Sequence, residues 1–306
     1  MYISSSSFSY RLLSGLLFCL LIACRNEADS NNQYVNKWIG TGLEGRVAPV
    51  ASVPFGMMQI GADTRPYGAG YHYDDPSILG FSHLHKSGGG CADFLDILFM
   101  PLPLNSGMAD EEIFLKKYQA VLFHKDEKAE PGYYSVGLYD KQLTVELTAS
   151  RRCGLQRYTY ASEGEIPVIV DLKYGSESAC TIQSEHDVDT VYASAFEWVD
   201  PYTVRGYRCS NGWTPGQQVY FYSTFSSPIK ECVLYVDDRR MEGMTSAEGT
   251  NIKALLTFES NTGELEVRTA LSSVDTQGAA KNLWAETKNK TFDVIREEAA
   301  GKWHDV

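Results

Sequence analysis

Alternating apolar and polar residues dominate the middle of the chain. "YYSVGLYD" (Tyr133–Asp140) and "LTVELTAS" (Leu143–Ser150) alternate with a period of two, and a short polar turn separates them. This pattern predicts a β-hairpin, because successive side chains on a strand point to opposite faces. Similar runs follow, mostly separated by Gly, Ser, Asn, Asp or Pro: "GLQRYTY", "IPVIVDL", "VYFYSTF", "ECVLYVD", "IKALLTF" and "LEVRTAL". Strands at this spacing without intervening helices indicate a mainly β fold, a large antiparallel β-sandwich.

After Ser273 the apolar residues recur at helical spacing instead. Thr291 is placed to be the N-cap of a helix, and Asp293 is favourable in its first turn. A stripe of residues three or four apart marks the buried face of this helix: Phe292, Ile295, Ala299, Trp303 and Val306. The helix either packs on the sandwich or opens a second, helical domain, and the pattern leaves both alternatives open.

The N-terminus predicts export. "LLSGLLFCLLIA" (Leu12–Ala23) is apolar and has the length of a signal peptide, too short to cross a bilayer. It runs into Ala23-Cys24, typical of a bacterial lipobox in which the cysteine receives a diacylglycerol. The alternative is an ordinary signal peptide with a chance cysteine. We therefore expect a signal peptide over residues 1–23, lipidation at Cys24, a tether over 24–33, and a protein anchored to the bacterial cell envelope through its lipid, in the periplasm or on the surface.

Composition narrows the class of protein. The 306 residues are 43% hydrophobic, which is enough for a sizeable core, and the net charge of -12 argues against nucleic acid or anionic membrane surfaces as partners. Without Cys19 and Cys24, an odd number of cysteines remains and no CxxC pair is present. We expect mainly free thiols, with one or two disulfides left open, among Cys91, Cys153, Cys180, Cys209 and Cys232.

The densest polar chemistry lies in "GYHYDDPSILGFSHLHKSGGGCADFLDILFMP" (Gly70–Pro101). His83 and His85 would point to the same face of a strand, and with Asp93 they would offer a metal three ligands. The alternative is a hydrogen-bonded histidine pair, and the weakness of an H-x-H signal favours it, so we predict no metal site. The "SGGG" turn indicates close backbone approach or positive φ rather than a phosphate cradle, because no Lys-Ser/Thr pair follows.

Arg65 is the second candidate for ligand binding. It stands just after a predicted strand that ends at Asp63-Thr64, where its guanidinium can hydrogen-bond two hydroxyls of one ligand. The alternatives are an ion pair with Asp63 or an exposed arginine. No Ser-His-Asp order, Cys-His pair or helical metalloprotease motif is evident, and the sequence singles out no acid/base pair among its carboxylates.

Several motifs occur in an order that identifies a family. They are "IGTG", "PFGMMQIGADT", the segment Gly70–Pro101, the segment Pro131–Tyr160 and "GYRCSNGW" (Gly206–Trp213). Together they resemble the N-terminal domain of glycoside hydrolase family 92, the calcium-dependent exo-acting alpha-mannosidases. The resemblance implies a β-sandwich over 34–273 and a helical linker over 274–306 that leads toward an (α/α)6 barrel missing from this chain.

The resemblance also implies a chemistry for the whole enzyme. The family inverts configuration by single displacement: a glutamic acid protonates the leaving oxygen, an aspartate activates water, and calcium holds the mannose in a distorted shape. The acid, the base and most calcium ligands come from the barrel, so the resemblance implies no catalytic residue and no metal ligand in this chain, which we expect to be inactive alone.

What remains for the chain is recognition of α-mannoside glycans. The residues expected to form one wall of the sugar pocket are Arg65, Tyr71, His72, His83 and His85, with Asp93 as support. Many family members carry a longer, tryptophan-bearing loop before the "GYHY" motif, which Tyr67 replaces only in part, so no linkage is assigned. The rival interpretation is a free-standing surface lipoprotein that binds mannan or other glycans.

Overall fold

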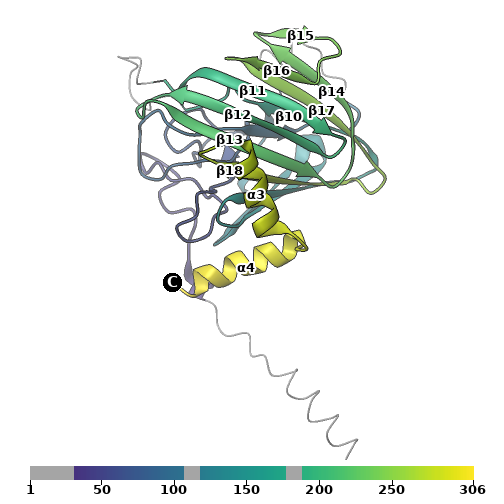
Figure 1. The fold of residues 1–306 in the computed structure, drawn as a ribbon. Helices are drawn as coiled ribbons and strands as arrows, with labels where there is room; N and C mark the ends of the chain where they lie inside the picture. Colours follow the sequence, from purple (N-terminus) through teal and green to yellow (C-terminus); the bar gives the residue numbers. More distant parts are fainter. Residues whose placement is uncertain (1–30, 107–117, 177–187) are drawn as a thin grey trace, which may run out of the picture.

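The fold is a sandwich of two antiparallel sheets, as the alternating pattern predicted. The computed structural model describes residues 31–106, 118–176 and 188–306. The predicted signal peptide, Cys24, residues 24–30 of the tether and Cys180 lie outside the described residues. Every ladder between neighbouring strands is antiparallel, and two C-terminal helices lie below the sandwich in Figure 1.

The larger sheet has nine strands in the order β16-β11-β12-β13-β18-β9-β8-β7-β6. Its strands are β6 (Glu127–Glu130), β7 (Tyr133–Leu138), β8 (Leu143–Ala149), β9 (Cys153–Tyr160), β11 (Thr190–Asp200), β12 (Thr203–Asn211), β13 (Gln217–Phe225), β16 (Ser246–Gly249) and β18 (Glu264–Ser272). The predicted hairpin is confirmed by β7 and β8, which η3 (Tyr139–Lys141) connects.

The smaller sheet has seven strands in the order β1-β3-β4-β10-β17-β14-β15. Its strands are β1 (Gly61–Asp63), β3 (Gly80–Ser82), β4 (Leu98–Pro101), β10 (Gly164–Asp171), β14 (Ile229–Val236), β15 (Arg239–Met241) and β17 (Ile252–Ser260). Outside both sheets, β2 (Ser77–Ile78) pairs with β5 (Ala120–Val121), and the other short turns are η1 (Asn31–Tyr34) and η2 (His124–Asp126).

The hydrophobic core fills the space between the two sheets. Val136 and Leu147 of the larger sheet belong to the same buried cluster as Phe99, Val168 and Leu256 of the smaller one. Along β8 the odd-numbered residues are buried while Thr144 is exposed, so the period of two corresponds to one face in the core and one outside. Strand β10, between β4 and β17, is buried continuously from Ile166 to Asp171 instead.

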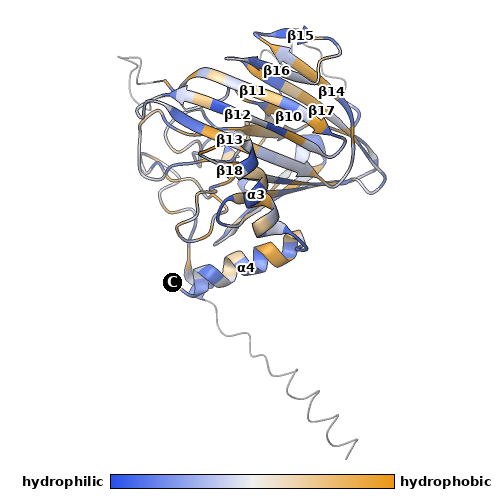
Figure 2. Ribbon diagram, viewed as in Figure 1, coloured by the Kyte–Doolittle hydropathy of each residue, from blue (hydrophilic) through white to orange (hydrophobic). Residues whose placement is uncertain are grey.

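The C-terminal helices α3 (Thr276–Thr287) and α4 (Phe292–His304) cover part of the outer face of the larger sheet. Thr291 caps α4 as predicted, its Oγ1 accepting a hydrogen bond from the Val294 N–H at 3.3 Å. Phe292 and Ile295 bury against Tyr133 and Leu155, and hydrophobic and hydrophilic residues alternate along the helix in Figure 2.

Helix α4 therefore packs on the sandwich in this structure. The end of its predicted stripe is wrong, however: Val306 is 81% exposed, because the helix stops at His304. Among the described residues, neither α3 nor α4 nor any other helix has the length and hydrophobicity needed to cross a bilayer. The four described cysteines, Cys91, Cys153, Cys209 and Cys232, are free thiols, as expected.

The histidine segment departs from the predicted strand. β3 ends at Ser82, one residue before His83. Beyond Ser82 the two segments are joined only irregularly, by hydrogen bonds from the His83 N–H to the Asp96 carbonyl at 3.1 Å and from the Leu95 N–H to the Leu84 carbonyl at 2.9 Å. Leu95 and Ile97 adopt φ of 63° and 58°, the left-handed region, which interrupts regular strand geometry. His83 and His85 are nevertheless both buried.

Candidate functional site

Three of the six predicted site residues meet at one small cleft. Arg65, Tyr71 and His72 line a cavity of ≈ 70 Å³ between two loops. The complete lining is Leu43, Glu44, Arg46, Arg65, Tyr67, Gly68, Ala69, Tyr71 and His72. We call this hollow the Arg65 cleft. One wall is formed by the loop that comes after strand β1, and the other by the glycine-rich loop around Gly42 and Gly45.

Arg65 is held by Asp75 rather than by Asp63, which corrects the pairing weighed from the sequence. Its Nε donates to Asp75 Oδ2 at 2.6 Å, and its Nη2 donates to Oδ1 of the same carboxylate. Burial acts to raise the pKa of Asp75, but hydrogen bonds from Arg65 and Thr64 outweigh it and lower this pKa. Arg65 and Asp75 thus form an ion pair with two hydrogen bonds. The Nη1 of Arg65 makes no hydrogen bond to any described residue, which leaves a donor for a ligand.

His72 fixes the loop beside Arg65. Its Nδ1 accepts from the Asp74 N–H at 3.1 Å, so the proton lies on Nε2, which donates to the Leu43 carbonyl at 3.1 Å. Both ring nitrogens are therefore occupied. The imidazole joins the two walls of the Arg65 cleft and offers a ligand its ring face rather than a free nitrogen.

Tyr71 also turns its polar end away from the cleft. Its hydroxyl donates to a carboxylate oxygen of Glu127 at 3.0 Å, and Glu127 also accepts from Tyr134 and from His124 Nδ1 at 2.6 Å. Burial, followed by the charge of Glu127, raises the pKa of Tyr71 far above its usual range. The hydroxyl therefore stays protonated as a donor to Glu127, and Tyr71 supports the cleft wall from within.

His85 lies under the backbone of the cleft and does not reach its surface. Its Nδ1 donates to the Gln59 carbonyl at 2.8 Å, and its Nε2 lies 3.3 Å from Asp63 Oδ1. The backbone of Gly70, at φ +86°, lies against His85 and Asp63. A Cβ at this position would stand 3.2 Å from the His85 ring and 2.6 Å from Asp63 Oδ1. The glycine of the "GYHY" motif is thus required by close approach as well as by conformation.

His83 is deeper still. Its Nδ1 donates to the Ile97 carbonyl at 2.7 Å, its Nε2 faces Gln156 Nε2 at 3.3 Å, and its ring meets Phe99 edge-on. Burial lowers its pKa to about 4. With exposures of 0% and 3%, neither His83 nor His85 can contact a sugar directly, which corrects their placement in the pocket wall.

Asp93 supports a different loop. Its Oδ1 accepts from the Thr214 N–H at 2.9 Å and its Oδ2 accepts from the Thr214 hydroxyl at 3.0 Å, while Lys86 Nζ donates to its carbonyl at 2.8 Å. Asp93 therefore ties the "SGGG" region to the loop after β12 and is absent from the Arg65 cleft lining. It is a support, but for the loop that directly follows the "GYRCSNGW" motif.

Sequence reasoning missed Arg46. This residue lines the cleft beside Arg65, and its Nη2 donates to Glu44 at 3.2 Å. A Cβ on Gly90 would stand 2.1 Å from Arg46 Nη1, so the "SGGG" glycines leave room for this side chain. In the sequence, the glycines clustered within residues 40–45 and 87–90 were the feature that could have indicated a close contact between these two loops.

The arrangement suits binding better than proton transfer. The carboxylates of Glu44 and Asp75 each face a guanidinium, while Tyr67 adds a ring 4.9 Å from the Arg65 Cζ. Among the described residues, no group of three His, Cys, Asp or Glu side chains is placed to hold a metal.

Comparison with known proteins identifies the family. Residues 34–272 match the model of the glycosyl hydrolase family 92 N-terminal domain. The structure superposes with a TM-score of 0.79 and 30% identity on a family GH92 alpha-mannosidase from Bacteroides thetaiotaomicron in complex with mannoimidazole, over 90% of this chain and 37% of that one.

Two further relatives agree. A family GH92 inverting mannosidase from B. thetaiotaomicron shares the fold, with a TM-score of 0.75 and 24% identity over 92% of this chain and 36% of that one. An uncharacterized secreted glycosidase of Arthroderma benhamiae is 26% identical over 89% of this chain and 37% of its own length. The chain thus spans well under half of each of these relatives. It belongs to the family of glycosyl hydrolase family 92 N-terminal domains.

Proposed function

We propose that this chain is the sugar-recognition domain of an alpha-mannosidase that acts at the ends of α-mannoside glycans with inversion of configuration. The observation that carries the proposal is the likeness, at 30% identity and over 90% of the chain, to an alpha-mannosidase bound to mannoimidazole. The Arg65 cleft supports a recognition role, because it offers an oriented guanidinium, a second arginine and an aromatic ring without a free acid/base pair.

The catalytic acid and base, in this proposal, come from the (α/α)6 domain expected from the resemblance. The described residues hold no metal cluster, so the calcium of the complete enzyme would have its ligands mostly on that second domain. The chain alone is then inactive. Turnover of an aryl α-mannoside by the isolated chain in the presence of calcium would contradict this division of labour.

The test uses the complete enzyme, comprising this chain and the second domain. We expect it to release mannose from α-mannosides, and Arg65→Ala to raise KM at least about tenfold, because a charge-assisted hydrogen bond contributes about 1.5–3 kcal/mol. Arg239→Ala is the matched control, since Arg239 is an exposed arginine of β15 and far from the cleft lining. Mannan binding by the complete protein with no release of mannose would instead favour the rival candidate, a surface lipoprotein that binds glycans.

Export and lipid anchoring complete the proposal. The relative from A. benhamiae is a secreted glycosidase, and the Ala23-Cys24 junction has the lipobox pattern. We expect the wild-type protein in the membrane fraction of a bacterial host and Cys24→Ser in the soluble fraction of the envelope. Equal membrane association of the two forms would contradict lipidation at Cys24.

A further inference from the structure

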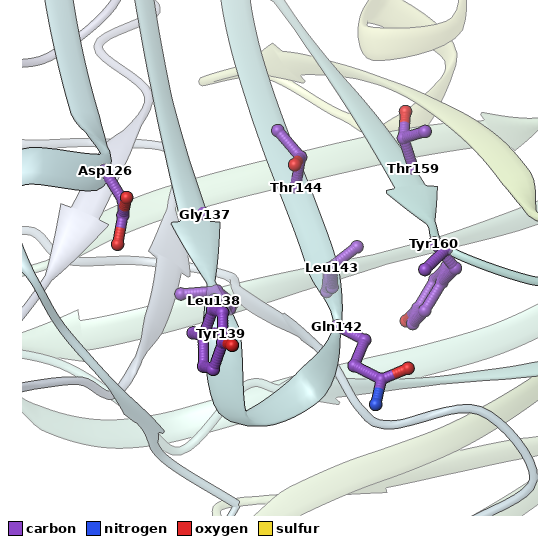
Figure 3. A pocket seen from close by; sticks show the side chains of 10 residues that line it. Asp126, Gly137, Leu138, Tyr139, Gln142, Leu143, Thr144, Thr159 and Tyr160 are labelled. Carbon is purple, nitrogen blue, oxygen red and sulfur yellow. The ribbon is translucent and has the colours of Figure 1, made fainter.

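A second, larger hollow lies on the nine-stranded sheet, where β7 ends and β8 begins (Figure 3). Its volume is ≈ 570 Å³, within the range of roughly 300–1,000 Å³ typical of small-molecule sites. It shares no lining residue with the Arg65 cleft. We call it the Tyr139 groove, and define it by Asp126, Gly137, Tyr139, Gln142, Thr144 and Thr159.

The strand register builds the floor of the Tyr139 groove. Gly137 pairs with Thr144, and Thr144 pairs with Thr159, so the three residues form one row across β7, β8 and β9. This row lies on the outer face, because Thr144 and Thr159 are exposed while Val145 and Tyr158 beside them are buried. Gly137 contributes no side chain, which leaves a trough between the threonines and Asp126.

Helix α4 leaves this row uncovered. Phe292 and Ile295 of the helix bury against Tyr133 and Leu155, which lie further along the same outer face. Between the helix and the groove, Arg157 pairs with Glu266 at 3.2 Å and with Asp293 at 3.0 Å. The outer face is therefore closed by packing at one end and open at the other.

Most polar side chains of the groove have no partner in the part of the chain that the structure describes. Among the described residues, none forms a hydrogen bond or ion pair with the carboxylate of Asp126, the amide of Gln142, the hydroxyl of Tyr139, or the hydroxyls of Thr144 and Thr159. Elsewhere in the same hollow, the Tyr160 hydroxyl is used, donating to the Leu102 carbonyl at 2.6 Å. Donors and acceptors without partners among the described residues thus line this hollow.

The chemistry of these groups selects the ligand. Tyr139 is 79% exposed and presents a large ring at the rim. No lysine, arginine or histidine lines the groove, which disfavours an anion, and no group of three metal-ligating side chains is present among the described residues. An aromatic ring with neutral hydroxyls, an amide and one carboxylate acceptor matches the apolar faces and the hydroxyls of a neutral sugar.

We infer that the Tyr139 groove is a second glycan-binding site, which takes neutral hexose units separately from the Arg65 cleft. A sugar ring stacks on Tyr139, and its hydroxyls donate to Asp126 and Gln142 and accept from Thr144 and Thr159. That the hexose is an α-linked mannose rests on the proposed function. The two sites flank one junction, since Asp126 is followed by Glu127, whose carboxylate holds Tyr71 of the cleft.

Calorimetric titration of the 306-residue chain with a soluble α-linked mannopentaose tests this site. We expect Tyr139→Ala to weaken binding at least about tenfold, because the loss of an aromatic contact of more than about 1.4 kcal/mol changes Kd by that factor. Tyr192→Ala is the matched control, since Tyr192 is 43% exposed and lies on β11, outside the groove. Arg65→Ala should retain the Tyr139-dependent binding, and the exposure of Tyr139 predicts an unchanged Tm.

The outcomes separate this inference from the proposed function. Equal affinity of wild type and Tyr139→Ala overturns the second site, even if the complete enzyme cleaves α-mannosides. Binding that Arg65→Ala abolishes and Tyr139→Ala leaves intact overturns it too, since the cleft would then be the single site. Tyr139-dependent binding of cellopentaose without binding of mannopentaose supports the groove and counts against the mannoside specificity of the proposed function.

Discussion

At the scale of single residues, buried histidines support the cleft through hydrogen bonds rather than by contacting a ligand. His85 joins Gln59 to the buried carboxylate of Asp63, directly beneath Gly70. His83 joins the Ile97 carbonyl to Gln156 of β9. The contact of His83 with Gln156 crosses to the larger sheet, while the other contacts hold loops beside the smaller sheet that have no regular ladder of their own. Each ring is therefore a fixed part of the core.

The low pKa of His83 predicts an acid-sensitive fold. Burial lowers this pKa from 6.5 to about 4, so as the pH falls the unfolded chain takes up this proton before the folded chain does. The free energy of unfolding should therefore fall by about 3 kcal/mol between pH 6.5 and pH 4 on account of this group, and be unaffected by it above pH 6.5. Urea unfolding of wild type and His83→Gln across this range measures the difference.

The comparison of slopes isolates His83 from other titrating groups. Asp96, for example, has its pKa raised to about 6 by burial, and acts in the opposite direction over the same range. We expect His83→Gln to lose the histidine contribution to the slope while His304→Gln, at an exposed position near the C-terminus, keeps it. Identical pH dependence in wild type and His83→Gln would show that the pKa of His83 is the same in the folded and unfolded chains, and would contradict the lowering by burial.

At the scale of elements, half-buried strands were predictable from the sequence. β7 and β8 lie where the alternation placed them, because each has one face in the core and one outside. The N-cap and the buried face of α4 were predictable as well. Helix α3 was not singled out, because its buried residues are Ala279, Leu283 and Thr287, which give little hydrophobic contrast along the sequence.

The candidate site was predictable only in part, because loops and register assemble it. Arg65, Tyr71 and His72 were predicted from the polar segment together with the family resemblance, and they do meet at one cleft. The partner Asp75 and the neighbour Arg46 depend on how two irregular loops fold back, which no periodicity encodes. The Tyr139 groove depends on the pairing of three strands, so it becomes visible only in the folded sheet.

At the scale of the whole molecule, one buried arginine connects the two sheets. Arg208 of β12 is completely buried in the larger sheet. Its Nη1 donates to Asp96 Oδ1 at 2.6 Å and its Nε donates to the Leu172 carbonyl at 3.1 Å, and these partners flank β4 and β10 of the smaller sheet. Asp189, just before β11, lies 2.8 Å from its Nη2. A single guanidinium thus holds three segments that are distant in sequence.

Replacing this guanidinium should destabilise the sandwich strongly. Arg208→Met leaves the carboxylates of Asp96 and Asp189 buried without a cation, which typically costs about 3–5 kcal/mol. Because burial already raises the pKa of Asp96 to about 6, loss of Arg208 raises it further, so the cost should be largest at pH 7 and shrink toward pH 5 as the carboxylate is neutralised. Guanidinium chloride unfolding of the purified chain at both pH values measures this cost.

The same strand supplies the control that makes the result specific. Arg205 of β12 pairs with Glu197 at 2.7 Å, but this pair is about two-fifths exposed, with side-chain exposures of 38% and 43%. Arg205→Met should cost less than about 1 kcal/mol, because water screens an exposed ion pair and solvates the partner left behind. An equal, small loss in the free energy of unfolding for Arg208→Met and Arg205→Met would mean that the charge of Arg208 is not needed to hold the two sheets together. A large, pH-dependent loss confined to Arg208→Met would show that the sheets are held together by this buried cation as well as by their apolar core.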